Sequence, residues 1–247
     1  MAYFPGQKKA PHKAGPLSPL LSNIVLDELD KELEGRGQGR GHKFVRYADD
    51  CNIYVKSRRA GERTLKSVQR FIESKLRLKV NEGKSAVDRP WKRKFLGFSF
   101  TSHKEPKVRI AKESLKRLHK KIRAITSRKR PYPMDYRIEK LNQYLMGWCG
   151  YFALADTVSI FTQLDGWIRR RLRLCLWKEW KKPKTKYRNL IKLGTSPSKA
   201  REWANSRKGY WRISKSPILH RNLGNSYWSH RGLKSLQNRY QTLRQLS

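Results

Sequence analysis

The first hydrophobic pattern along the chain is that of a helix. Ser18 at an N-cap and Pro19 at the first helical position form a typical helix start. Leucines then recur at helical spacing until Gly35 and Gly37, where the pattern ends. The sequence therefore predicts a helix that begins at Ser18 and stops at these two glycines.

Strand-like patterns follow this helix. Two short β-prone runs, 43–48 and 51–56, flank the pair Asp49-Asp50 and predict a β-hairpin with both acids at its tip. The next predicted elements are a helix over 59–76 and strands over 78–80 and 95–100.

Helical patterns dominate the rest of the chain. Apolar side chains recur every three or four residues over 115–125, 138–152 and 158–180, which predicts three amphipathic helices in a small bundle. The basic run 181–186 contains a proline and predicts a linker. The last sixty residues or so have weaker periodicity and predict a small, mainly helical module.

These patterns predict an α+β protein in four parts. The first is a flexible basic arm over 1–14, and the second, over 15–105, carries a small antiparallel sheet. The third is the helical bundle over 106–180, and the fourth is a basic C-terminal region over 181–247.

The charge of the chain points to a polyanionic partner. Lys and Arg total 58 against 19 Asp and Glu, a formal net charge of +39. Eight Trp, eleven Tyr and eight Phe lie among the cations, and aromatic faces beside cations suit stacking and phosphate contact in RNA. The sequence has no apolar run of about 18 residues and no signal-peptide pattern, so we expect no membrane partner and a cytoplasmic location.

The three cysteines give no sign of a zinc or disulfide site. Cys51, Cys149 and Cys175 are widely spaced and form no CxxC pair. The carboxylates are more informative, because two adjacent acids at a hairpin tip can hold Mg²⁺ through oxygen ligands. Polymerases use such acids to join a 3′-hydroxyl to a nucleoside triphosphate. An Asp-Asp pair by itself is also a common polar turn.

The flanking residues make the pair specific. Phe44–Asp50, which reads Phe-Val-Arg-Tyr-Ala-Asp-Asp, resembles the metal-binding motif of group II intron-encoded reverse transcriptase/maturases. Upstream, Gly15–Ile24 is similar to the template and nucleotide side of that family's palm. Downstream, Asn81 and Lys84-Ser85 match the following motif, and Phe95–Phe98 matches the hairpin that grips the primer.

The resemblance continues into the helical region. Leu141-Asn142, Gly147–Phe152 and Trp167 with the arginines that follow it resemble the family's maturase region, a helical thumb that binds RNA. Short segments over 206–236 resemble the C-terminal part of bacterial members. Because no His/Cys-rich module follows, the resemblance is to the endonuclease-lacking type.

The resemblance implies roles for individual residues. Asp49 and Asp50 would be the catalytic metal ligands for Mg²⁺, and Lys84 would stabilise charge or act as a general acid at the departing pyrophosphate. Tyr47 and Ala48 would lie at the primer end. The other residues implied for primer and template are Leu17, Ser18, Pro19, Phe95, Leu96, Gly97 and Phe98. The residues implied for RNA contact are Trp167 and, on the exposed side of its helix, Arg169, Arg170, Arg171 and Arg173. Ordinary core packing for the phenylalanines, and a solvated surface for the lysine and the arginines, are the alternatives.

The resemblance also implies fold, function and partners. The fold would be a partial polymerase palm with a small antiparallel sheet, then an α-helical thumb/maturase bundle and a small basic module. The function would be RNA-directed DNA polymerase (nucleotidyltransferase) activity and intron RNA splicing or mobility, in a cytoplasmic ribonucleoprotein with intron RNA, an RNA template and a DNA primer. The alternatives are a non-catalytic maturase-like splicing factor and a generic basic ribonucleoprotein component.

One family feature has no counterpart in the sequence. The family palm has a third acid on a strand before the Leu17 segment, but no Asp or Glu precedes Asp27 here. We therefore expect a truncated palm that does not polymerise DNA alone, with a palm and fingers segment or another copy as a possible partner.

Overall fold

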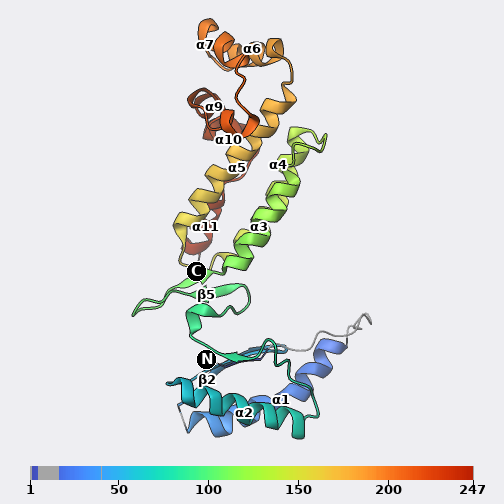
Figure 1. Cartoon of the computed structure of the whole chain (residues 1–247), viewed down its shortest axis with the longest axis vertical. Helices are drawn as coiled ribbons and strands as arrows, with labels where there is room; N and C mark the ends of the chain where they lie inside the picture. Colours follow the sequence, from blue (N-terminus) through green and yellow to red (C-terminus); the bar gives the residue numbers. More distant parts are fainter. Residues whose placement is uncertain (1, 5–16, 40, 247) are drawn as a thin grey trace. The chain divides into compact units, whose positions relative to one another are not determined.

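The computed structural model describes residues 2–4, 17–39 and 41–246 (Figure 1). The chain divides into two compact units, Met1–Lys104 and Glu105–Ser247. In the described residues no helix is both long and apolar enough to cross a membrane.

The first unit is built on a four-stranded antiparallel sheet. Its strands lie in the order β2-β3-β1-β4, so the strand nearest the N-terminus pairs with β3 and β4. The strands are β1 (Ala2–Phe4), β2 (Lys43–Tyr47), β3 (Asp50–Tyr54) and β4 (Ala86–Val87).

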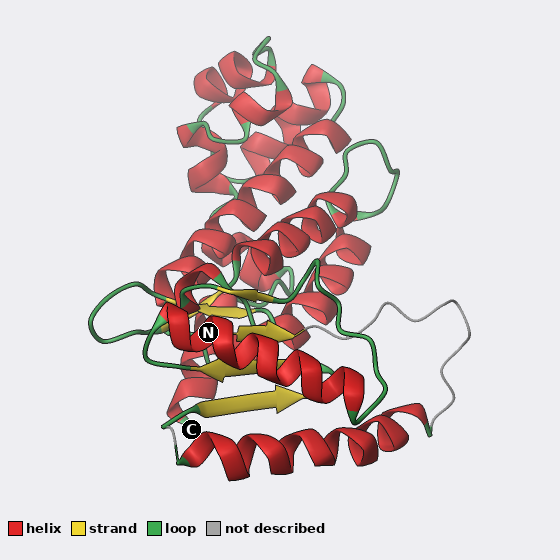
Figure 2. Cartoon of the chain, turned by 60° about the horizontal axis from the view of Figure 1, so that its bottom comes forward, coloured by secondary structure: helices red, strands yellow, loops and turns green. Residues whose placement is uncertain are grey.

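Two helices, α1 (Ser18–Gln38) and α2 (Arg58–Ser74), pack on one face of this sheet. Figure 2 shows them running alongside the strands. The Ser57 side chain caps α2 by accepting a hydrogen bond from the Ala60 N–H at 3.2 Å. The core between helices and sheet consists of Leu26, Leu29, Leu33, Cys51, Ile53, Val68 and Ile72. The predicted helices and hairpin are therefore confirmed, and the α+β class with them.

Several boundaries in the first unit differ from the prediction. Helix α1 continues through Gly35 and Gly37 to Gln38, because a glycine weakens a helix by only about 1 kcal/mol. The predicted strand over 78–80 is absent from the described residues. Arg77 instead adopts a left-handed φ of 54°, and the Leu78 N–H donates to the Ile72 carbonyl at 3.1 Å, which closes the end of α2.

The two ends of the first unit also differ from the prediction. Ala2–Phe4 pairs with β3, so the prediction of a flexible arm is wrong for these three residues; residues 5–14 of that arm lie outside the described ones. The strand predicted over 95–100 is shorter, with β5 limited to Phe98–Phe100 after a one-turn 3₁₀ helix, η1 (Pro90–Lys92).

The second unit is helical apart from one short strand, β6 (Val108–Ile110). The three predicted amphipathic helices are confirmed as α3 (Lys112–Ile125), α4 (Met134–Phe152) and α5 (Val158–Glu179). Six shorter helices follow, namely α6 (Pro183–Lys192), α7 (Pro197–Ala204), α8 (Tyr210–Ile213), α9 (Pro217–Asn222), α10 (Asn225–His230) and α11 (Leu236–Gln245).

The last helix closes the bundle. Helix α11 packs against α4 and α5, where Tyr240 stacks on Phe161 with ring centroids 4.4 Å apart. The Tyr240 hydroxyl donates to the Ala155 carbonyl at 2.8 Å. The predicted linker over 181–186 is wrong, because α6 starts at Pro183. Proline suits the first helical position, where its missing N–H costs nothing.

Candidate catalytic hairpin and nucleic-acid interface

The candidate catalytic acids lie at the β2–β3 hairpin. Tyr47 pairs with Asp50 in the ladder, which leaves Ala48 and Asp49 as a two-residue turn. Ala48 has a φ of 51°, the left-handed conformation that such short hairpin turns require. Asp49 is exposed in the turn, whereas Asp50 is the first residue of β3 and half-buried. The structure thus places only one of the two acids in the turn itself.

Alternation along β2 separates two sets of side chains. Phe44 and Arg46 are half-buried, while Lys43, Val45 and Tyr47 are exposed on the opposite face. Tyr47 is 63% exposed, and its cross-strand partner Asp50 extends to the same face of the sheet. An exposed aromatic ring and a carboxylate therefore lie side by side next to the turn that carries Asp49.

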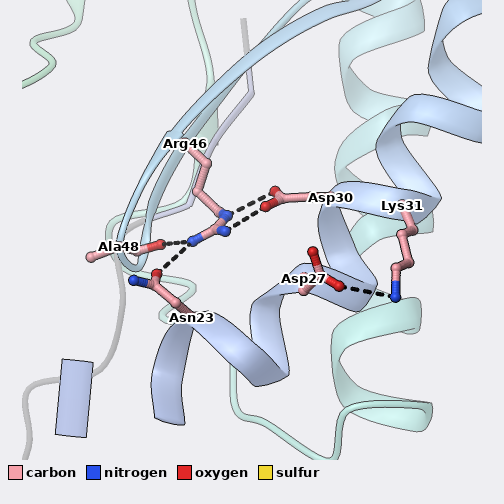
Figure 3. Close-up of polar contacts among 6 residues, drawn as sticks. All are labelled: Asn23, Asp27, Asp30, Lys31, Arg46 and Ala48. Carbon is pink, nitrogen blue, oxygen red and sulfur yellow. Dashed lines mark hydrogen bonds and ion pairs between the residues drawn. The ribbon is translucent and has the colours of Figure 1, made fainter. Parts of the chain in front are cut away.

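Arg46 ties this turn to helix α1 (Figure 3). Its Nε donates to Asp30 Oδ1 at 2.7 Å, and its Nη2 pairs with Asp30 Oδ2. Its Nη1 donates to the Ala48 carbonyl at 2.8 Å and to Asn23 Oδ1 at 3.2 Å. The hydrogen bonds to Asp30 raise the pKa of Arg46, so its positive charge is held firmly. One guanidinium thus fixes the turn carbonyl to two side chains of α1.

The sequence analysis did not single out Arg46, Asp30 or Asn23. Arg46 stands inside the motif that resembles the family, three residues before Asp49, and that position was the available signal. Asp30 gave no such signal, because helix α1 carries five acids. Asp27, for comparison, pairs with Lys31 at 2.9 Å on the exposed side of the helix (Figure 3).

The hairpin supplies part of a magnesium site. Carboxylate oxygens are the ligands that Mg²⁺ prefers, and the hairpin carries two adjacent carboxylates, Asp49 in the turn and Asp50 at the start of β3. Across the described residues, no three His, Cys, Asp or Glu side chains gather into a possible metal site. The donor chemistry therefore fits a divalent cation, with further ligands needed to complete its coordination.

The other predicted palm residues lie on separate turns. Lys84 is exposed in a turn closed by its N–H to the Asn81 carbonyl at 3.1 Å. Phe95 and Phe98 exchange both backbone hydrogen bonds, at 3.0 and 2.9 Å, around a second two-residue turn. In that turn Leu96 and Gly97 have φ of 50° and 82°. Glycine suits position 97 because it adopts a positive φ without a steric penalty.

At the start of α1 the apolar side chains face solvent. Leu17 is 65% exposed, and Leu20 and Leu21 are 57% and 59% exposed. The side chains of Ser18 and Pro19 lie outside the described ones. The predicted template-side segment thus begins with an uncovered apolar turn.

The arginines of α5 are used largely within the second unit. Arg170 lies 3.7 Å from the centre of the Trp211 ring and donates to the Trp211 carbonyl at 3.1 Å. Arg171 donates to Thr126 Oγ1 at 2.9 Å and to the Thr126 carbonyl at 3.0 Å. Trp167 packs edge-on against His119, with ring centroids 4.7 Å apart.

Arg173 is buried, with 6% of its surface exposed, and the prediction of an exposed position is wrong for it. Its guanidinium donates to the carbonyls of Ser214 and Leu223 at 2.9 and 3.2 Å. Burial, reinforced by neighbouring Arg169 and Arg170, lowers its pKa to about 10. The error arises because α5 is covered by the C-terminal helices, which a single helix period does not reveal.

Comparison with known proteins gives two family matches. Residues 15–100 match the family described as "Reverse transcriptase (RNA-dependent DNA polymerase)", and residues 115–194 match "Group II intron, maturase-specific domain". The chain is also similar to the retron Ec86 reverse transcriptase of Escherichia coli, with 27% identity over 148 residues. That alignment covers 60% of this chain and 42% of the length of the curated relative.

The order of these matches agrees with the geometry. The reverse transcriptase match contains the Asp49 hairpin, the Lys84 turn and the Phe95–Phe98 turn, and the maturase match begins in α3 and ends just after α6. A reverse transcriptase domain followed by a maturase-specific domain on one chain places this protein in the family of group II intron-encoded reverse transcriptase/maturases.

Proposed function

We propose that this chain acts in RNA-directed DNA synthesis and RNA splicing at a group II intron. The observation that supports the polymerase part is the hairpin, which puts the Asp49 carboxylate in a fixed two-residue turn beside exposed Tyr47. The second unit, with its maturase-specific match, would bind the intron RNA. The template would be RNA, and the primer DNA.

The reaction joins the primer 3′-hydroxyl to the α-phosphorus of a deoxynucleoside triphosphate. A new P–O bond forms, the bond to the leaving pyrophosphate breaks, and the hydroxyl proton is lost. Bound Mg²⁺ would stabilise the attacking and leaving oxygens. Asp49 would be a direct ligand and Asp50 a supporting one, while Tyr47 would position the primer end. Lys84 would stabilise the charge on the pyrophosphate or protonate it.

Arg46 would hold this arrangement in place. Its contacts with Asp30, Asn23 and the Ala48 carbonyl fix the turn that carries Asp49. Catalysis is sensitive to displacements of about 1 Å, so a turn anchored to a helix suits a metal ligand. We assign Arg46 as a positioning residue for the hairpin.

We further propose that a third carboxylate reaches this site from another polypeptide segment. In the described part of the chain no third His, Cys, Asp or Glu joins the two acids in a possible metal site. A palm and fingers segment, or another copy of the chain, would be the partner that supplies it.

A second candidate function is RNA binding without polymerisation. It is favoured by the same incomplete ligand set, together with the charge of the second unit, which has 35 Lys and Arg against 8 Asp and Glu. In that case the chain would assist splicing by holding intron RNA, and the hairpin would serve as a structural remnant of the polymerase.

Primer extension on an RNA template with Mg²⁺ separates the two functions. The 247-residue chain would be tested alone and mixed with a separately expressed palm and fingers segment of a close relative. We expect extension only in the mixture, and its loss with Asp49→Ala. Glu73→Ala, which removes an exposed acid of α2 and leaves both hairpin acids in place, is the matched control and should leave extension unchanged.

Other results would contradict this assignment. Extension by the chain alone that is abolished by Asp49→Ala would show that no partner is needed. Salt-sensitive RNA binding without extension under either condition would favour the second candidate function.

A further inference from the structure

We infer that the cavity between helices α3 and α4 binds a single unstacked nucleotide of RNA. The cavity has a volume of about 370 Å³ and is lined by residues of α3, of α4 and of the loop 126–133 between them. Figure 1 shows this loop joining the two helices. This inference deepens the proposed function and rests on it, because it names the site and the form of RNA that the second unit would hold. Ligand-sized cavities begin at roughly 300 Å³, so the volume suits one nucleotide.

Three tyrosines form the aromatic part of the cavity. Tyr132 and Tyr136 lie with ring centroids 5.0 Å apart at 49°, and Tyr144 stands two turns further along α4. Tyr132 is 37% exposed and Tyr136 is 41% exposed, so their rings are open to a ligand. An exposed pair of tilted rings, one on helix α4 and one on the loop before it, offers stacking surface to a base that has left its own stack.

Three cations complete the cavity, each near a tyrosine. Lys121 Nζ lies 5.9 Å from the Tyr144 ring centre, and Lys140 Nζ lies 5.7 Å from that of Tyr136. The Arg130 guanidinium lies 5.9 Å from the centre of the Tyr132 ring. Among the described residues that line the cavity, none is acidic. The cations therefore lack a local counter-charge, which a phosphate on either side of a stacked base would provide.

The cavity on the other side of Tyr132 is less suited to this role. It is lined by Glu179, whose carboxylate opposes an anion, and by Arg137. The Arg137 guanidinium is already used by four carbonyls, those of Ile125, Ser127, Arg130 and Tyr132. Arg137 thus shapes the loop that presents Arg130 and Tyr132 and has little capacity left for a ligand.

This site replaces part of the predicted RNA surface on α5. Arg173 is buried, and Arg170 and Arg171 donate to backbone carbonyls within the unit, so their donors are largely occupied. Among the contacts that the structure describes, the lysine and tyrosine side chains of the α3–α4 cavity donate to no backbone carbonyl. Of these residues, Tyr132 contacts Arg137, but only through its backbone carbonyl. Stacking side chains and cations are therefore available together here.

The test uses the full 247-residue chain and a short, fluorescently labelled oligouridylate. Tyr132→Ala with Tyr136→Ala removes the exposed rings and leaves the net charge unchanged. We expect its Kd for the single strand, measured by anisotropy, to rise about five- to fiftyfold, as for the loss of a base–aromatic stack. Tyr136→Phe keeps the ring and should bind as the unaltered chain does. Circular dichroism would establish that each variant is folded.

A matched control comes from the same helix. Tyr151 is 53% exposed on α4 but does not line the cavity, so Tyr151→Ala should leave the affinity unchanged. A length-matched RNA duplex, which offers no unstacked base, should bind the double variant and the unaltered chain equally. Lys121→Gln with Lys140→Gln should lower the slope of log Kd against log salt by about 0.7 for each phosphate that is no longer neutralised by a lysine.

The outcomes distinguish this inference from the proposed function. If the unaltered chain binds no RNA, the proposed function itself fails. If the unaltered chain binds the single strand and the double tyrosine variant binds it equally well, the proposed function stands and the nucleotide site is wrong. A polyglutamate peptide that competes as well as the oligonucleotide would show a general anion site and would also overturn the inference.

Discussion

Arg46 in the first unit and the buried Arg137 and Arg173 in the second unit differ in the groups that they contact. In the first unit Arg46 pairs with a carboxylate, Asp30, and only one of its contacts goes to a backbone carbonyl. In the second unit Arg173 contacts carbonyls, and Arg137 contacts four of them. A carbonyl accepts a hydrogen bond but does not neutralise the charge, so Arg137 and Arg173 keep a positive charge that Asp30 cancels locally at Arg46.

The composition of the units shows the same difference. The first unit has 23 Lys and Arg against 11 Asp and Glu, and the second has 35 against 8. An unneutralised charge of this size opposes compaction unless a polyanion or salt screens it. The comparison teaches that Arg46 fixes a turn by pairing with one carboxylate, whereas the second unit carries the larger excess of positive charge, as its proposed role in binding RNA requires.

The largest effect is expected from Arg173→Ala in the second unit. The substitution leaves the Ser214 and Leu223 carbonyls without their donor and opens a cavity beside α5. We expect the free energy of unfolding to fall by about 3–4 kcal/mol. Chemical denaturation monitored by tryptophan fluorescence would measure it. An unchanged unfolding midpoint would show that the buried arginine is not a structural element of this unit.

A smaller loss of unfolding free energy is expected from Asp165→Ala. Asp165 belongs to α5, and its carboxylate contacts the first residues of α11. Asp165 accepts hydrogen bonds from the Ser235 hydroxyl at 2.7 Å and from the N–H groups of Leu236 and Gln237 at 2.9 and 3.2 Å. We expect the unfolding free energy to fall by about 2–3 kcal/mol, the range for hydrogen bonds to a charged group. Asp156→Ala is the control.

Asp156, between α4 and α5, pairs with Arg244 of α11 at 2.7 Å but is about one-third exposed. Its loss should cost about 1 kcal/mol or less. Equal effects of the two aspartate variants would contradict the role of Asp165 as the buried partner of the α11 N-terminus.

In the first unit, Arg46→Ala should lower the unfolding free energy by about 1–2 kcal/mol. The ion pair with Asp30 is partly buried, with side-chain exposures of 13% and 26%, so solvent screens some of it. Arg46→Lys keeps the charge but loses the planar fork, and should recover less than half of the loss. Full recovery with lysine would show that only the charge at this position matters.

The smallest effect is a difference in thiol reactivity between the units. Burial raises the pKa of Cys51 in the first unit to about 12 and that of Cys149 in the second to about 11. Since the thiolate is the reactive form, native alkylation should stay slow and should rise about tenfold per pH unit from about pH 7 to pH 9 without levelling, whereas that of an exposed thiol levels off near its pKa of about 8.5. A rate that levels off below about pH 9 would show an ordinary pKa.

The same labelling orders the units by stability. In mild denaturant we expect Cys51 to react before Cys149, because the first unit has the smaller core. Mass spectrometry of peptides from a timed alkylation would read out both sites at once. Earlier labelling of Cys149 would reverse the comparison.

Much of the local structure follows from local signals. The periodicity of α1 and α2, the hairpin around Asp49 and the three bundle helices could all be predicted, because each depends on residues within one or two turns of each other. The family motifs could also be found in this way, since they are short and contiguous. The ends of the elements were less predictable, as the continuation of α1 through Gly35 shows.

The amino-acid sequence alone determined the helices, the hairpin with its two acids, the positive charge and the family. The tertiary structure alone decided which partners the charged groups take. Asp30 stands out from the other acids of α1 only through Arg46, sixteen residues away, and Arg173 is buried only because residues 214–223 cover it. The strand Ala2–Phe4 likewise exists through its pairing with β3. Such contacts join residues distant in sequence, and a pattern with a period of two or four residues carries no information about them.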